Sequence, residues 1–134
     1  MKYLLDTNIC IYLIKNNPEK VIKHFSKKKP GDIFISSITV SELYFGVAKS
    51  ARQNENLVAL KEFLQPLSIL EFTEDDAIAY GGLRTQLEQA GTPIGAMDML
   101  IAAHALSRGL VIVTNKEKEF RKVNGLVIEN WANS

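Results

Sequence analysis

The sequence predicts an α/β fold in which helices cover both faces of a mainly parallel sheet. Short apolar runs alternate with longer segments of helical spacing along the whole chain, as in proteins whose parallel strands are joined by helices. The apolar runs are continuous rather than alternating, which is typical of strands buried on both faces. With 134 residues, 46% of them hydrophobic and 23% charged, the chain has room for one domain with its own core. We therefore expect a single domain over residues 1–134.

Five apolar runs are the expected strands. They comprise residues 3–5, 33–35, 67–70, 110–113 and 126–128. In open α/β sheets, ligands bind beyond the carboxyl ends of the strands. Polar residues that directly follow these runs are therefore candidates for a functional site.

Six segments between these runs are the expected helices. They comprise residues 9–14, about 21–25, 39–47, 54–64, 73–89 and 97–107. Thr73 and Asp76 form a capping pattern at the start of the longest one, and Gly109 is a typical helix stop after the last. Residues 30–32, Pro-Gly-Asp, favour a turn.

Three acidic residues stand out, although each has an ordinary structural explanation. Asp6 follows the first expected strand, but it could simply cap the next helix. Glu42 stands three residues after Thr39, the spacing of a capping box in which the glutamate reaches back to a backbone amide. Asp98 opens an apolar helix, where an acid complements the helix dipole. None of the three is diagnostic by itself.

Taken together, the three acids predict a metal site. Each begins a helix, and helix starts and strand ends share one edge of such a sandwich, so the acids could converge there. Carboxylates gathered in an apolar cleft resist ionisation, and a divalent cation removes that conflict. An all-oxygen site favours Mg²⁺, with Mn²⁺ as an alternative.

Such a site predicts phosphodiester hydrolysis. A bound Mg²⁺ would hold a phosphate oxygen and lower the pKa of a water molecule. Asp6 and Asp98 are then the expected direct ligands. Glu42 would bind the metal directly, bind it through water, or orient the attacking water.

Four segments, taken in order, resemble the successive motifs of PIN-domain ribonucleases, and among these the VapC toxins of bacterial type II toxin–antitoxin modules. They are Leu5-Asp6-Thr7-Asn8, residues 39–43, residues 98–105 and Val113-Thr114-Asn115. The resemblance extends from Met1 to Trp131. It implies a PIN-like three-layer α/β/α sandwich, Mg²⁺-dependent RNA cleavage, and metal-site roles for Asp6, Glu42 and Asp98.

The same resemblance implies partners and a substrate. It implies a homodimer, with a larger toxin–antitoxin assembly as an alternative, and inhibition by a cognate VapB-type antitoxin. The chain is most similar to the subgroup that cuts initiator tRNA in its anticodon stem-loop. Gly95 before Asp98, the alanine-histidine run, Thr114-Asn115 and Glu119-Phe120 carry that likeness.

The chain departs from the family pattern at one position. Many PIN domains carry a fourth acid after the threonine that ends the fourth strand, but this chain has Asn115-Lys116 there. Glu119, a turn later, is the remaining candidate ligand, and it could equally be a surface acid.

Seven further residues have expected roles around the acids. Thr7, Asn8, Thr114 and Asn115 could orient the ligands through hydrogen bonds, although turn and cap roles explain them as well. A late basic cluster could bind substrate phosphates or be a solvated helix face. Its expected substrate-binding members are Lys116, Lys118 and Arg121.

The overall composition narrows the function only slightly. The net charge of +1 does not by itself indicate a nucleic-acid binder. Cys10 is the only cysteine, which favours a reducing cytoplasm, and no apolar stretch is long enough for a membrane span. The alternative to a nuclease is a catalytically silent PIN-like module that binds RNA or protein.

Overall fold

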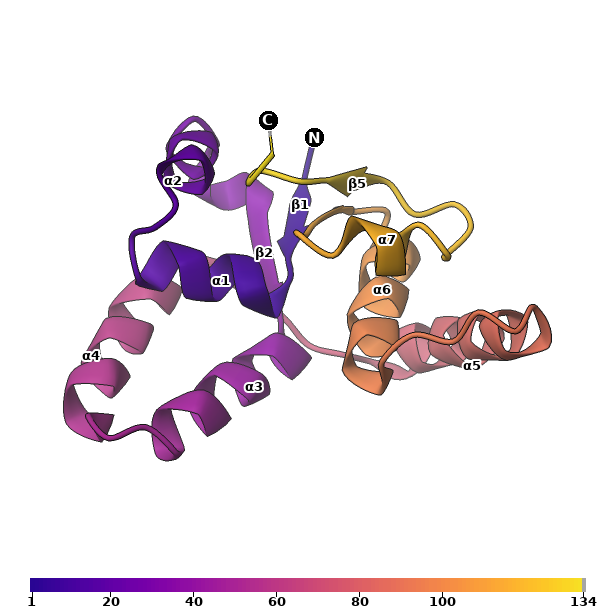
Figure 1. Cartoon of the computed structure of the whole chain (residues 1–134), viewed down its shortest axis with the longest axis horizontal. Helices are drawn as coiled ribbons and strands as arrows, with labels where there is room; N and C mark the ends of the chain where they lie inside the picture. The colour runs from indigo at the N-terminus through magenta and orange to yellow at the C-terminus, as the bar shows by residue number, and fades with distance from the viewer. Residues whose placement is uncertain (134) are drawn as a thin grey trace.

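The computed structural model describes residues 1–133, which form strands alternating with helices as predicted (Figure 1). The strands are β1 (Tyr3–Leu5), β2 (Ile33–Ser36), β3 (Ser68–Leu70), β4 (Val111–Val113) and β5 (Ile128–Glu129). The helices are α1 (Thr7–Ile14), α2 (Glu19–Ser26), α3 (Ser37–Ala48), α4 (Gln53–Leu64), α5 (Glu74–Gln89), α6 (Ala96–Arg108) and α7 (Glu117–Phe120).

The strands form one sheet in the order β3-β2-β1-β4-β5, and every adjacent pair is parallel. The central strand β1 pairs with β4 so that Leu5 lies opposite Val113. Asp6 and Thr114 follow these two residues directly, and the Asp6 amide donates a 3.0 Å hydrogen bond to the Val113 carbonyl. The register therefore places both polar residues side by side at the carboxyl edge of the sheet.

Hydrophobic side chains pack against both faces of the sheet, which confirms the three-layer α/β/α sandwich. Tyr3 and Leu5 point into a core with α1 to α4, whereas Leu4 points into a second core with α5, α6 and α7. Leu4 and Leu5 have no exposed surface, as expected for a strand covered on both sides.

Most element boundaries lie within two residues of the sequence prediction, and two of the differences have a clear physical reason. Helix α3 begins before Thr39, because the Ser36 hydroxyl caps it by accepting from the Ile38 amide at 3.1 Å. Strand β5 begins at Ile128 rather than residue 126, because its pairing with β4 starts there. Residues 30–32 form a short 3₁₀ helix, which confirms the predicted turn. The four-residue helix α7 is too short for a periodic pattern.

A buried polar network links β2, α5 and α6. The His104 Nδ1 lies 2.8 Å from the Ser36 hydroxyl, and the Asp76 carboxylate accepts from Arg108 at 3.0 and 3.1 Å. Ser36, Asp76 and His104 are all buried. Burial alone would raise the pKa of Asp76, but hydrogen bonds from Arg108 and Thr73 outweigh it and hold that pKa well below its usual range. Asp76 is therefore a buried anion that depends on Arg108.

Replacing Arg108 by methionine should lower the free energy of unfolding by about 2 kcal/mol, because it leaves the Asp76 carboxylate buried without its cation. Urea unfolding measures the change. Arg84→Met is the matched control, since the Arg84–Glu88 pair is about half exposed and such pairs contribute little. Equal effects of the two substitutions would contradict the dependence of Asp76 on Arg108.

Candidate active site

Asp6 is fixed at the junction of β1 and α1. It caps α1, and one carboxylate oxygen accepts from the backbone amides of Asn8 at 2.7 Å and Ile9 at 3.3 Å. Its other oxygen accepts from the Thr114 hydroxyl at 2.5 Å. The side chain is almost fully buried. The capping role and the site role, which the sequence left as alternatives, are therefore compatible.

Burial makes the negative charge of Asp6 costly. Desolvation raises its pKa, and the hydrogen bonds from Thr114, Ile9 and Asn8, together with the positive charge of Lys116, only partly offset this effect. A buried carboxylate in this condition gains most from a nearby cation.

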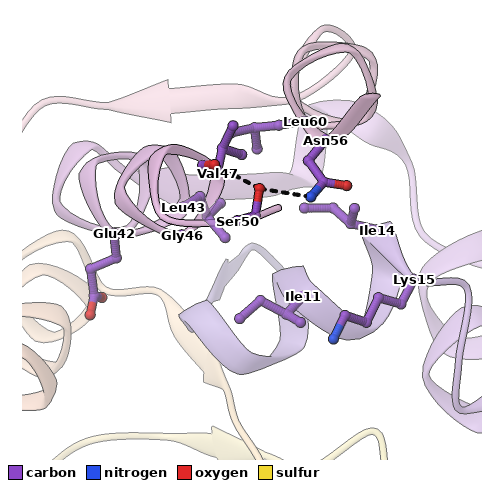
Figure 2. A pocket seen from close by; sticks show the side chains of 10 residues that line it. All are labelled: Ile11, Ile14, Lys15, Glu42, Leu43, Gly46, Val47, Ser50, Asn56 and Leu60. Carbon is purple, nitrogen blue, oxygen red and sulfur yellow. Dashed lines mark hydrogen bonds between the residues drawn. The ribbon is translucent and has the colours of Figure 1, made fainter. Parts of the chain in front are cut away.

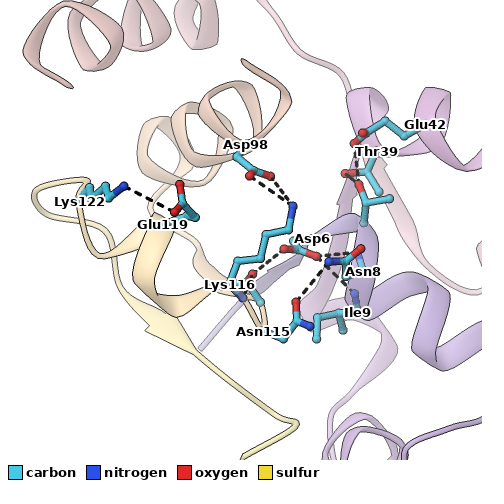
Figure 3. A network of polar contacts seen from close by, with 12 residues as sticks. Asp6, Asn8, Ile9, Thr39, Glu42, Asp98, Asn115, Lys116, Glu119 and Lys122 are labelled. Atoms are coloured by element: carbon cyan, nitrogen blue, oxygen red, sulfur yellow. Dashed lines mark hydrogen bonds and ion pairs between the residues drawn. The ribbon is translucent and has the colours of Figure 1, made fainter. Parts of the chain in front are cut away.

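Asp98 lies in the first turn of α6 and faces a lysine. Both of its carboxylate oxygens lie 3.4 Å from the Lys116 ammonium, and 21% of its side chain is exposed. Figure 3 shows the Lys116 side chain running past Asp6 toward Asp98. One cation thus lies close to both of the acids that the sequence proposes as direct ligands.

Glu42 lies on α3 and contacts Thr7, the residue that begins α1 and directly follows Asp6. Its carboxylate accepts a 2.6 Å hydrogen bond from the Thr7 hydroxyl, which also lies 3.5 Å from that of Thr39 (Figure 3). The alternative of a capping box between Thr39 and Glu42 is wrong. Ser36 caps α3 instead, so Glu42 lies in the interior of the helix and is free to contact another element.

Glu119 lies on α7, where its carboxylate pairs with Lys122 at 3.5 Å and 40% of its side chain is exposed. It is thus engaged with a neighbouring lysine rather than with Asp6 or Asp98. The structure places it at the outer side of the site (Figure 3).

The amide of Asn115 is held by two residues of α1. Its Nδ2 donates to the Tyr12 hydroxyl at 2.7 Å, and its Oδ1 accepts from Asn8 at 3.4 Å. The sequence prediction did not include Tyr12. The available signal was its position four residues after Asn8, which places the two side chains on one face of a helix.

The acids share one edge of the sheet without forming a tight cluster. Among residues 1–133, no three side chains of His, Cys, Asp or Glu lie close enough together to hold a metal ion. Asp6 and Asp98 are linked through Lys116, with Glu42 and Glu119 on either side. This donor set still fits Mg²⁺, which binds proteins through one or two carboxylates and keeps several water molecules. A bound cation would stabilise the ionised form of the buried Asp6 carboxylate, which burial disfavours.

The three expected substrate-binding residues lie on or beside α7. Lys116 is engaged by Asp98, and Arg121 pairs with Glu117 at 3.2 Å. Lys118 is exposed on the surface of the helix.

An apolar groove of about 320 Å³ runs beside the site between α1, α3 and α4. Most of its lining is aliphatic, including Ile11, Ile14, Leu43 and Leu60. Figure 2 shows Glu42 at one end of the groove. Any occupant of the groove would therefore reach the edge of the acidic site.

Comparison with known proteins gives the family. A model of the PIN domain matches residues 3–126. The tRNA(fMet)-specific endonucleases VapC of Shigella flexneri and Salmonella typhimurium are 42% and 43% identical to the chain. The alignments cover 98% of the chain in both cases, and 99% and 98% of those two proteins.

Solved structures agree with this result. The DNA-bound VapBC of Salmonella typhimurium superposes with a TM-score of 0.92 at 43% identity, covering 98% of each chain. The VapBC2 of Rickettsia felis, bound to a promoter DNA fragment, gives 0.90 at 41% identity and covers 98% of this chain and 99% of that one. The chain belongs to the PIN-domain family. Within that family, the relatives named here are VapC proteins.

Replacing Asp6 by asparagine should leave the protein at least as stable as the wild type in the absence of metal. Asparagine is as good a helix cap as aspartate, and removal of the buried charge offsets the loss of the acceptor for the Thr114 hydroxyl, which the asparagine NH2 group cannot replace. Thermal unfolding in EDTA measures this. Asp6→Ala is the comparison, because it removes the cap and should cost about 1 kcal/mol. A clear loss of stability in Asp6→Asn would contradict the idea that the Asp6 charge is costly.

Proposed function

We propose that the chain is a Mg²⁺-dependent endoribonuclease of the VapC toxin type. The observation that carries the proposal is that Asp6 and Asp98 lie near the same lysine, Lys116, at the carboxyl edge of a PIN-domain sheet. The match of the family model over residues 3–126 and the nuclease names of the relatives support it.

Asp6 and Asp98 would hold the metal, and Glu42 would bind it through water or orient the attacking water. Mg²⁺, or Mn²⁺ in its place, would polarise the scissile phosphate and lower the pKa of a water molecule. Thr114 holds the Asp6 carboxylate and Thr7 holds that of Glu42. Asn8 and Asn115 brace each other beside them. Such contacts keep ligands in one orientation before substrate arrives.

Glu119 is the proposed ligand of a second, weaker metal position. In the structure it pairs with Lys122, so it would have to exchange this partner for the ion. Because Glu119 lies at the outer side of the site, we propose that substrate phosphate completes this second position.

The proposed substrate is RNA, and more narrowly initiator tRNA cut in its anticodon stem-loop. Two relatives at 42% and 43% identity are named tRNA(fMet)-specific endonucleases. Lys116, Lys118 and Arg121, on or beside α7, would bind the phosphates of the RNA backbone. The proposed location is the cytoplasm, where such a substrate is found. No helix within residues 1–133 is long and apolar enough to cross a membrane.

The proposed partner is a VapB-type antitoxin, since the solved relatives with TM-scores of 0.90 and 0.92 are VapBC complexes. The groove between α1, α3 and α4 is a suitable seat for an apolar antitoxin segment, because it ends at Glu42 and an occupant would cover the site. A homodimer, alone or within a larger complex, completes the proposal.

The test is cleavage of tRNA by the purified protein with Mg²⁺. Asp98→Asn should lower the rate at least about 100-fold, because it removes a metal ligand, and EDTA should abolish cleavage by the wild type. Asp75→Asn is the matched control, since Asp75 is an exposed acid in the first turn of α5, and it should leave the rate unchanged. RNA binding without any cleavage by the wild type would instead favour a silent binding module.

A further inference from the structure

Lys116 is held through both its backbone amide and its side-chain ammonium. Its backbone amide donates a 2.9 Å hydrogen bond to the Thr114 hydroxyl, the same hydroxyl that donates to Asp6. Its ammonium lies 3.4 Å from both carboxylate oxygens of Asp98. Thr114 therefore couples the backbone of Lys116 to Asp6, and the Lys116 side chain extends from there to Asp98 (Figure 3).

The ammonium of Lys116 does for these acids what a metal ion would do. It forms an ion pair with Asp98, and its positive charge stabilises the ionised form of the buried Asp6. In the part of the chain covering residues 1–133, no other basic side chain forms an ion pair with either acid. The acids thus have a cation supplied by the chain itself.

The Lys116 side chain can move away from Asp98. Of its surface, 42% is exposed, and lysine carries its charge on a flexible four-carbon stem. An ion pair this open to solvent is weak. Lys116 can therefore turn toward solvent without disrupting the core.

We propose that Lys116 is a built-in counter-ion of the metal site, which neutralises Asp6 and Asp98 in the metal-free protein and is displaced when a divalent cation binds. The proposal rests on the proposed function, because it assumes that these two acids bind the metal. A divalent cation on the Asp98 carboxylate would lie next to the Lys116 ammonium, which is 3.4 Å from both of its oxygens, and the two positive charges would repel each other. Lys116 therefore weakens metal binding.

Displacement of Lys116 by a metal ion would also let this residue serve two roles, as the ion-pair partner of Asp98 and as a ligand of substrate phosphate. Once released from Asp98, the ammonium would be free to contact a phosphate of an RNA substrate. The predicted role of Lys116 in substrate binding would then follow the loss of its ion pair with Asp98 on metal binding.

The test is direct titration of Mn²⁺ into the full-length protein, with free Mn²⁺ measured by electron paramagnetic resonance. Lys116→Met removes the charge without adding an oxygen ligand, and it should bind Mn²⁺ about fivefold more tightly than the wild type, the equivalent of one weak ion pair. Lys116→Arg keeps the charge and should stay close to the wild type. Lys61→Met, an exposed lysine on α4, is the control for loss of one positive charge.

Thermal unfolding provides a second readout that does not depend on catalysis. Lys116→Met should unfold at a lower temperature than the wild type in EDTA, and saturating Mn²⁺ should raise its midpoint by more than it raises that of the wild type. Unchanged or weaker Mn²⁺ binding by Lys116→Met would overturn the counter-ion role, even if tRNA cleavage persists. Tighter binding without any RNA cleavage would support that role and count against the nuclease proposal instead.

Discussion

The candidate site of this protein is organised around one buried carboxylate, that of Asp6, whose negative charge is costly. Asp6 caps α1, accepts from Thr114 and is almost fully buried, so the first backbone amides of α1 and the Thr114 hydroxyl set the orientation of its carboxylate. Desolvation penalises its charge. Hydrogen bonds from Thr114, Ile9 and Asn8 and the positive charge of Lys116 partly offset this penalty.

The parallel sheet makes this arrangement possible. Because β1 and β4 are adjacent and in register, residues that are 108 positions apart come within hydrogen-bonding distance at the same edge. Helix α3 brings Glu42 to Thr7, α6 brings Asp98, and the segment before α7 brings Lys116. The polar network around Asp76 lies elsewhere, between β2, α5 and α6, and it braces the helices on the second face of the sheet.

The sequence predicted the sheet well, because continuous apolar runs are local signals, and it correctly placed Asp6 at the end of β1 and Asp98 in the first turn of α6; their role as metal ligands stays a prediction. It failed where the deciding contact is distant in the chain. Thr39 and Glu42 imitate a capping box, whereas Glu42 bonds to Thr7. The role of Tyr12 depends on Asn115, 103 residues away. The pairing of Lys116 with Asp98 spans 18 residues, and no spacing rule indicates it.

Metal binding by Asp6 and Asp98 can be observed in a crystal of the protein soaked with Mn²⁺ and measured at the manganese absorption edge. We predict an anomalous peak bounded by the carboxylates of Asp6 and Asp98, with the Lys116 side chain turned away from Asp98. A peak away from both carboxylates, or no peak with Lys116 still paired to Asp98 at saturating Mn²⁺, would contradict this prediction.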